Sequence, residues 1–508
     1  MIKTNHPLIT GRPAPFLAAL AGLTSTVIIG FRGFGDPGLA WLDRSQNGLQ
    51  HLLQSPPEPT LLIDLFAAGL SRLPLAQGWI LVGLTFLASA LTTGLLFQLG
   101  RQLNGVLTGW IAVFFALTAA PYMGIFTSAD PTALAIPLVA ALILAWFSDL
   151  PPWIRGGLCG LLLALTALST PFAALLILVF LLVIAARRSE ISLDHLLAPL
   201  LASALLLAAL SLWGPPLAVL HHLWLSPLSQ SPDLLLFRGQ IYPPRRPPLY
   251  FGAAWILEQL PIVTAIVLLL SLFLAPKFLK GKERHQAITL SFIALLLMLL
   301  PVFLRTSRPL GLHFEALFLL ASLPLGAVIT VHFLGYCMGP DAPALRLRRF
   351  AIAVFVVIAT GILLESRSSL AYPESQRSPL TARLLGWSVT SDLPQREPFL
   401  PLEVVRLSLE PSQALLYLHP WEDHLHAYAQ MGLISANRLT DDPENATTSI
   451  RALPAIALTR FARYDQGFVL QTLEGSTRAI PGRHRPIFFI DQSWPARTKP
   501  DSEHPPSP

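Results

Sequence analysis

Charged residues are scarce in this chain of 508 residues: only 13% are Asp, Glu, Lys or Arg, whereas 53% are hydrophobic. A typical soluble domain carries about 25% charged residues. A single hydrophobic core also stops growing at about 250–300 residues, so one soluble core cannot hold this many apolar side chains. The shortage of charge therefore argues against an ordinary soluble protein and for an integral membrane protein.

Cysteine is scarcer still: Cys159 and Cys337 are the only two, and both lie in apolar stretches. They cannot form a disulfide framework, so the compartment has to be inferred from the membrane spans. We also expect no cleavable signal peptide, because the first apolar run, 14–31, has no small-residue cleavage site and further spans follow it. We expect this run to be a signal anchor.

Apolar runs, in contrast, are long and frequent. A helix needs about 20 predominantly apolar residues to cross a bilayer. Runs near this length occupy residues 14–31, 78–98, 106–121, 132–148, 157–169, 172–186, 196–213, 251–275, 286–304, 314–334 and 350–364. They predict an α-helical polytopic membrane protein with about eleven transmembrane helices.

Lysine and arginine indicate the orientation, because short cytoplasmic loops are enriched in both. With the N-terminus in the cytoplasm, all the lysine-rich loops fall on that side, and the cytoplasmic segments hold Lys3, Arg12, Arg101, Arg155, Arg187, Arg188, Lys277, Lys280, Lys282, Arg284, Arg346, Arg348 and Arg349. The net charge of +6 thus describes topology and gives no reason to expect nucleic acid as a partner. We expect a multi-pass protein of the plasma (inner) membrane, surrounded by membrane lipids, with residues 366–508 on the extracytoplasmic side.

Four loops are expected at the outer face of a membrane domain that covers residues 1–365. They are residues 32–77, 122–131, 214–250 and 305–313. The first contains two amphipathic stretches, 38–53 and 60–73, which are able to lie in the plane of the membrane interface. The third is rich in proline, which rules out a continuous helix there and predicts an ordered loop or a lid.

The C-terminal region has a different composition. Short apolar runs at 414–418, 467–470 and 486–490 predict strands, and residues 422–432 predict a helix. We therefore expect a small extracytoplasmic α/β domain over 366–494. The Pro- and charge-rich residues 495–508 predict a disordered tail.

Charged groups at the outer face are the candidates for chemistry. They are Asp36, Asp43, Asp130, Arg305, Arg308 and His313. A single acid at such a place more often solvates a loop, and a single arginine often extends to the membrane interface. Together, however, they suit a phosphate-bearing lipid, because guanidinium groups bind phosphate and a carboxylate can activate a hydroxyl nucleophile.

A series of short motifs accompanies these residues over about 10–365. In order they are Gly35-Asp36-Pro37-Gly38-Leu39-Ala40-Trp41-Leu42-Asp43, Pro56-Pro57, Leu99-Gly100-Arg101-Gln102-Leu103-Asn104-Gly105, Pro121-Tyr122, Ser128-Ala129-Asp130, Phe237-Arg238-Gly239-Gln240, Pro247-Pro248-Leu249-Tyr250, Arg305-Thr306-Ser307-Arg308-Pro309, His313-Phe314 and Leu323-Pro324. Their order resembles the GT-C superfamily of membrane glycosyltransferases, in the branch similar to protein O-mannosyltransferases and aminoarabinose transferases. The C-terminal domain carries none of these motifs.

The resemblance implies an inverting transfer of sugar from a polyprenyl-phosphate donor to a glycan, lipid or protein acceptor at the outer face. The family's catalytic base corresponds to Asp36, with Asp43 and Asp130 as supporting acids. Donor-phosphate binding falls to Arg305, Arg308 and His313, and the loop near the site contributes Arg245, Arg246 and Tyr250.

Two positions depart from the family pattern. Pro37 replaces the second acid of an Asp-Glu pair, and Phe314 replaces a tyrosine. A divalent metal is compatible with this chemistry but not required, and any metal site that needs the second acid is lost. A catalytically inactive GT-C-like scaffold in envelope glycan assembly is the alternative that these departures raise.

A lipid or glycan transporter is the other alternative. Ion-coupled carriers usually place ionisable residues at the membrane midplane, and the predicted spans carry almost none, with Glu258 and Glu315 as the exceptions. His424 and His426 are two positions apart on a predicted helix and so do not share a face. We expect no metal site at these histidines.

Overall fold

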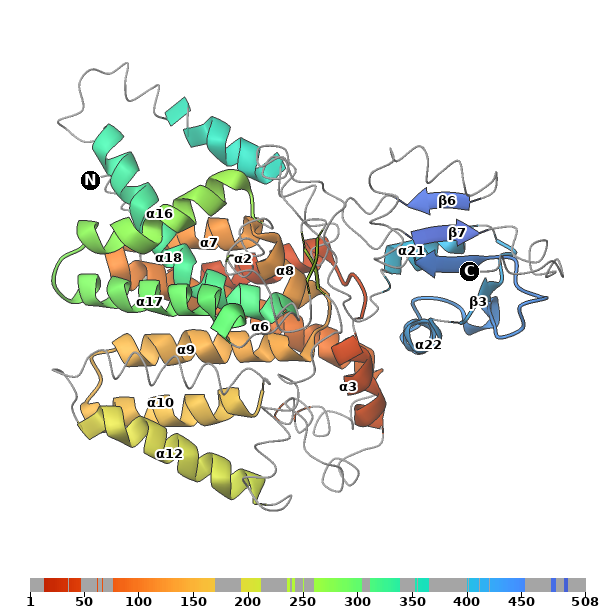
Figure 1. Ribbon diagram of the computed structural model, residues 1–508, viewed down its shortest axis with the longest axis horizontal. Helices are drawn as coiled ribbons and strands as arrows, with labels where there is room; N and C mark the ends of the chain where they lie inside the picture. Colours follow the sequence, from red (N-terminus) through yellow and green to blue (C-terminus); the bar gives the residue numbers. More distant parts are fainter. Residues whose placement is uncertain are drawn as a thin grey trace.

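A computed structural model of the protein describes part of the chain in detail. The described residues are 13–34, 36–46, 62, 66, 76–169, 193–211, 235–237, 240–242, 250, 260–303, 311–338, 352–353, 355–364, 400, 402–410, 412–419, 421–452, 477–480 and 488–491. Within them the protein is mostly helical, and a bundle of long helices is joined at one end by a small domain that contains strands (Figure 1).

The bundle consists of apolar helices, most of which coincide with the predicted runs. They are α2 (Ala14–Ile29), α6 (Gln77–Asn104), α7 (Val106–Thr118), α8 (Ala120–Thr127), α9 (Ala135–Phe147), α10 (Pro152–Ala167), α12 (Leu193–Leu210), α16 (Ile262–Phe278), α17 (Gly281–Phe303), α18 (Gly311–Met338) and the helix Phe355–Leu364. Each predicted run overlaps one of them except 172–186, which lies outside the described residues.

Few of these helices are long enough by themselves to cross a membrane. Within the described residues, α6 and the Glu315–Tyr336 part of α18 are long and apolar enough to cross a membrane, and the bent pair α7–α8 would be a third. The other helices in the described ranges are shorter or fall short of this test. The mostly helical architecture is therefore confirmed, while the number of about eleven spans stays a prediction.

Close helix contacts in the bundle depend on small residues. α2 packs along α6, and a Cβ atom added to Gly22 would lie 2.5 Å from Thr93 Oγ1. A Cβ added to Gly94 would lie 3.1 Å from the Pro15 carbonyl oxygen. Small residues let helix backbones approach in this way, which favours association in an apolar environment.

Residues 122–131 differ from the loop expected there. Ala119 leaves the helical conformation at the end of α7, and α8 starts again with Pro121 in its first turn at an angle of 67°. All eight residues of α8 are buried, and the hydroxyl groups of Tyr122 and Thr127 are hydrogen-bonded to Thr93 Oγ1 and the Met123 carbonyl oxygen. This segment therefore packs inside the bundle as a helix. The short 3₁₀ helix η1 (Pro131–Leu134) then leads into α9.

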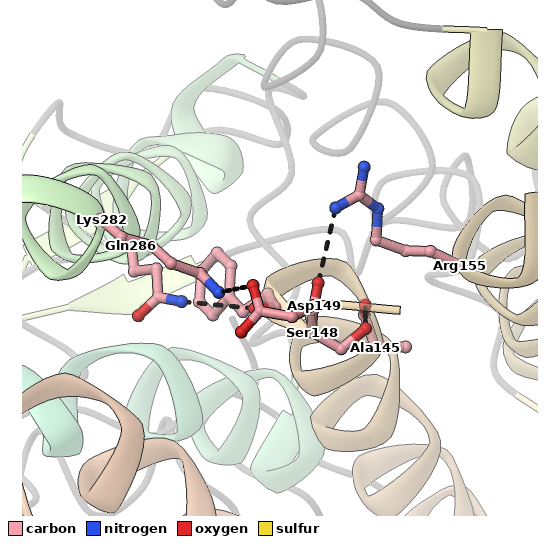
Figure 2. A network of polar contacts seen from close by, with 7 residues as sticks. Ala145, Ser148, Asp149, Arg155, Lys282 and Gln286 are labelled. Carbon is pink, nitrogen blue, oxygen red and sulfur yellow. Dashed lines mark hydrogen bonds and ion pairs between the residues drawn. The ribbon is translucent and has the colours of Figure 1, made fainter. Parts of the chain in front are cut away.

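One end of the bundle, which we call the Asp149 end, comprises the turn 148–151 between α9 and α10 and the start of α17. The Lys282 ammonium group pairs with the Asp149 carboxylate, and Arg155 Nη1 donates to the Ser148 carbonyl oxygen at 3.4 Å (Figure 2). Gln286 Nε2 reaches the Phe147 carbonyl oxygen at 3.5 Å. Two loops predicted to be cytoplasmic therefore meet at the same end.

The C-terminal domain combines short helices and strands. Its elements are α21 (Leu402–Ser408), β3 (Leu416–Tyr417), α22 (Glu422–Gln430), η5 (Ala436–Arg438), β4 (Leu439–Thr440), β5 (Ser449–Ala452), β6 (Thr477–Ile480) and β7 (Phe488–Asp491). β3 pairs with β4 in parallel, while β7 lies between β5 and β6 in an antiparallel sheet. The predicted run 467–470 lies outside the described residues.

A separate hairpin lies in the Pro-rich segment 214–250. β1 (Leu235–Phe237) pairs with β2 (Gln240–Tyr242) in antiparallel register, with Leu236 opposite Ile241. Most of the remaining segment lies outside the described residues. This segment therefore contains an ordered hairpin, which agrees with the expectation that its prolines rule out a continuous helix.

Candidate functional site

The candidate site lies at the opposite end of the bundle, where residues 30–34 join α2 to α3 (Asp36–Gln46). Gly30 ends α2 with a φ of 76°, and Gly33 has a φ of 146°, two backbone conformations that favour glycine. The segment is neither helix nor strand, so its buried peptide groups need partners from other parts of the chain. We call the segment with α3, the turn 127–130 and the start of α6 the Asp36 end.

Partners for this segment come from both sides. The Arg32 amide donates to the Thr127 carbonyl oxygen at 3.0 Å, and the Arg32 carbonyl oxygen accepts from the Leu402 amide at 2.9 Å. The Phe34 amide donates to the Tyr428 hydroxyl at 3.2 Å. The chain leading to Asp36 is thus held between the end of α8 and the C-terminal domain.

Apolar packing reinforces these hydrogen bonds. The ring of Phe34 stacks on that of Tyr428 with centroids 5.9 Å apart, and Phe31 lies 4.8 Å from Phe34. Trp79 Nε1 in the first turn of α6 donates to the Met431 carbonyl oxygen at 3.0 Å. Buried side chains of the bundle and of the C-terminal domain therefore form one continuous hydrophobic cluster here.

Two predicted acids lie on α3. Asp36 is its first residue, and nothing is described of the Asp36 side chain; Asp43 is exposed. Trp41 and Leu42 are buried, so the helix packs one face against the cluster. Positions 36 and 43 are seven apart and therefore share a face of the helix. α3 covers the first part of the stretch predicted at 38–53, while 47–53 and most of 60–73 lie outside the described residues.

The third acid, Asp130, lies close to the start of α3. A Cβ added to Gly38 would be 3.0 Å from the Ala129 carbonyl oxygen, so the first turn of α3 touches the turn before η1. Asp130 itself caps η1, accepting hydrogen bonds from the Thr132 amide at 2.8 Å and hydroxyl at 2.6 Å. The structure thus brings the segments of Asp36 and Asp130 together and gives the Asp130 carboxylate a structural role.

The basic residues predicted for the donor are less completely described. Arg305, Arg308, Arg245 and Arg246 lie outside the described residues. His313 belongs to the first turn of α18, and nothing is described of its side chain, whereas Tyr250 is exposed. Their convergence on Asp36 stays a prediction.

Arg32 is a candidate that the sequence analysis missed. Its Nε atom is buried without a hydrogen-bond partner, and the same holds for Ser128 Oγ, Trp41 Nε1 and Gln77 Oε1 among the described residues at this end. A buried polar group without a partner costs about 1–3 kcal/mol. The signal that could have revealed Arg32 is a charge directly after a membrane span and four residues before Asp36.

The histidines of α22 have different surroundings. His424 is buried with its ring 5.5 Å from that of Trp421, while the exposed His426 lies 3.9 Å from Glu422 Oε1. Within the described ranges, no three His, Cys, Asp or Glu side chains gather as metal ligands would. Each histidine thus has a contact within its own domain.

Comparison with known proteins places the fold. No family model and no curated protein matches the chain. Among solved structures, the archaeal oligosaccharyltransferase AglB from Archaeoglobus fulgidus, in complex with an inhibitory peptide and a dolichol-phosphate, matches with a TM-score of 0.50 and 10% identity over 94% of this chain and 74% of that one. Two structures of ArnT from Cupriavidus metallidurans match over 94% of this chain and 97% of their own. The apo structure has a TM-score of 0.46 and 13% identity, and the structure bound to undecaprenyl phosphate has a TM-score of 0.49 and 11% identity.

At such low identities the similarity concerns the fold alone. The conclusion about the fold rests on the match with AglB, whose TM-score is 0.50. The structural resemblance to GT-C membrane glycosyltransferases, expected from the order of the motifs, is confirmed over 94% of the chain. The apolar helices agree with a membrane protein.

Proposed function

We propose that this protein is an inverting membrane glycosyltransferase that moves a sugar from a polyprenyl-phosphate donor to an acceptor at the outer face. The observation that carries the proposal is the fixed path of residues 30–34, which leads to Asp36 and is held by hydrogen bonds from α8 and from the C-terminal domain. The shared fold with AglB, whose solved structure contains a dolichol-phosphate, supports a lipid-linked donor.

In the proposed reaction the Asp36 carboxylate takes the proton of an acceptor hydroxyl. The acceptor oxygen forms a bond to the anomeric carbon as the bond from that carbon to the donor phosphate breaks, which inverts the configuration. The electron pair of the broken bond leaves with the polyprenyl phosphate. A general base of this kind typically contributes about 10²–10⁴-fold to the rate.

Basic residues would stabilise the departing phosphate. We assign this role to Arg305, Arg308 and His313, and we add Arg32 because its buried guanidinium Nε has no hydrogen-bond partner among the described residues. Guanidinium groups bind phosphate oxygens through paired hydrogen bonds. Arg245, Arg246 and Tyr250 belong to the loop proposed to lie over the donor. Asp43 and Asp130 would support α3 and the adjoining turn around the base.

A divalent cation is compatible with this chemistry but not needed for it, because side chains supply both the base and the phosphate-binding groups. Pro37 offers no carboxylate beside Asp36. The acceptor is a glycan, a lipid or a protein, and each would present its hydroxyl on the same side as Asp36.

The test is Asp36→Asn in membranes of cells that lack the native gene. The amide has the shape of the acid but cannot take the proton, so transfer should fall by about 10²–10⁴-fold while expression is unchanged. Asp149→Asn is the matched control, because it makes the same change at the far end of the bundle, where Asp149 pairs with Lys282. Normal transfer by the Asp36 variant would remove Asp36 as the base, and a lack of transfer by the unaltered protein would favour the inactive scaffold.

A transporter has less support. Among the described residues of the bundle, Glu315 is the one fully buried acidic side chain. Carriers that couple transport to ions usually need several such groups along a path. Glu315 makes further contacts within the protein, which agrees with a structural role for it.

A further inference from the structure

We infer that Tyr428 of the C-terminal domain is a positioning residue for Asp36, an inference that rests on the proposed glycosyltransferase function. Tyr428 lies on α22, which is in contact with α3 at the right of the bundle in Figure 1. Its side chain is fully buried, so its hydroxyl group must be satisfied by the protein. One partner of that hydroxyl, the Phe34 amide, lies at the Asp36 end.

The Tyr428 hydroxyl connects two segments that are distant in the sequence. It accepts a hydrogen bond from the Phe34 amide at 3.2 Å and donates its own proton to the Leu400 carbonyl oxygen. Phe34 precedes Asp36 by two residues. The bond therefore holds the backbone immediately before the proposed base.

Further hydrogen bonds fix the position of the C-terminal domain around the bond between Phe34 and Tyr428. Leu402, two residues after Leu400, donates its amide to the Arg32 carbonyl oxygen at 2.9 Å. Met431, three residues after Tyr428, accepts from Trp79 Nε1 at 3.0 Å, and α6 is packed against α2 and α7. The C-terminal domain is thus anchored to the rigid bundle at α6 while it holds the segment 32–34.

The segment cannot replace this contact from within itself. Residues 30–34 form no helix or strand, so the Phe34 amide has no neighbouring backbone acceptor in a regular element. Without the Tyr428 hydroxyl, a buried amide would stay unsatisfied, and the segment would shift to reach another acceptor. A displacement of about 1 Å at a reacting group can lower a rate by up to about 100-fold.

The experiment compares two conservative variants of the full-length protein in lipid nanodiscs. Tyr428→Phe keeps the stacked ring and removes the hydroxyl. Trp421→Phe is the control, because Trp421 Nε1 donates to the Ile450 carbonyl oxygen at 3.2 Å inside the C-terminal domain and makes no hydrogen bond to residues 30–34 in the described structure. Tyr428→Phe loses two buried hydrogen bonds, from the Phe34 amide and to the Leu400 carbonyl oxygen, whereas Trp421→Phe loses one, to the Ile450 carbonyl oxygen.

Two readouts are measured. Hydrogen–deuterium exchange of peptides covering 31–36 reports on the segment without any enzymatic assay. Steady-state transfer from a polyprenyl-phosphate sugar reports on kcat and KM. Loss of one hydrogen bond should speed exchange of the Phe34 amide by about tenfold in Tyr428→Phe and lower kcat by about tenfold with KM within about twofold, while Trp421→Phe changes neither.

Three results would overturn the inference. They are unchanged exchange at 31–36 in Tyr428→Phe, faster exchange with an unchanged kcat, and an equal loss of kcat in both variants. If the unaltered protein transfers no sugar, the proposed function fails, and the exchange result alone still decides whether Tyr428 holds the segment.

Discussion

The two ends of the helix bundle are held together by different kinds of contact. At the Asp149 end the Lys282–Asp149 pair has side chains that are 49% and 91% exposed. At the Asp36 end the contacts are buried backbone hydrogen bonds and stacked aromatic rings, supplied by two domains. Exposed ion pairs add little stability, whereas buried hydrogen bonds fix geometry. The difference indicates that the Asp36 end holds particular backbone atoms in place in a way that the exposed Lys282–Asp149 pair does not.

The membrane orientation of the two ends gives an all-or-none test. Alkaline phosphatase fused after Glu410 should be active and green fluorescent protein there should be dark, because the C-terminal domain is expected outside the cell membrane. Fusions after Leu150, in the turn of the Asp149 end, should show the opposite pattern. The same pattern at both sites would remove the proposed topology, and phosphatase activity at Leu150 alone would invert it.

A larger side chain at Gly38 should disturb the Asp36 end strongly. Gly38→Val would place its Cβ 3.0 Å from the Ala129 carbonyl oxygen and 3.0 Å from Phe34 Cδ1, so α3 has to move. We expect about a 100-fold loss of kcat for transfer, since a small displacement of the base has this effect. Gly157→Val is the control, because open space surrounds Gly157 on α10. Equal rates for the two variants would contradict the close approach.

The two ends also differ in what their arginines do. Arg32→Ala should raise KM for the lipid-linked donor about tenfold, because a charge-assisted hydrogen bond to phosphate contributes about 1.5–3 kcal/mol. Arg155→Ala should leave KM within about twofold, since Arg155 lies at the Asp149 end, where its Nη1 donates to the Ser148 carbonyl oxygen at 3.4 Å. Donor titration with both variants measures this. An unchanged KM for Arg32→Ala would remove Arg32 from the proposed site.

The smallest effect is expected at the exposed pair. Lys282→Ala should lower the melting temperature by no more than about 2 °C and leave transfer unchanged, because exposed ion pairs contribute little. Thermal unfolding followed by tryptophan fluorescence measures the shift. A large drop would show that the Asp149 end is held as firmly as the Asp36 end, which would break the contrast between them.

Much of the helical architecture could be predicted from the sequence. Hydropathy is a local property, so runs such as 78–98 and 314–334 located α6 and α18 without any knowledge of their neighbours. The exception at 122–131 is instructive: its place between the predicted spans 106–121 and 132–148 suggested a loop, yet α8 packs inside the bundle. Local composition could not show that a bend at Ala119 keeps this stretch buried.

The candidate site could be predicted only in outline. Asp36 and Asp130 were chosen because both follow predicted spans on one face, and the contact of Gly38 with Ala129 brings their segments together. Arg32 escaped notice because burial of its Nε atom depends on tertiary packing. A sequence pattern reports which residues lie near one membrane face, but not which polar atoms lack a partner there.

The class of the protein, its apolar helices and the motif around Asp36 follow from residue order, because bilayer thickness and helix rise act on each segment separately. The contacts that fix the position of that motif do not follow from residue order. Phe34 and Tyr428 are 394 positions apart, and no periodicity or composition connects them. Only the folded chain could assign the Phe34 amide to the Tyr428 hydroxyl, because a buried peptide group accepts whichever partner the packing of two domains brings within reach.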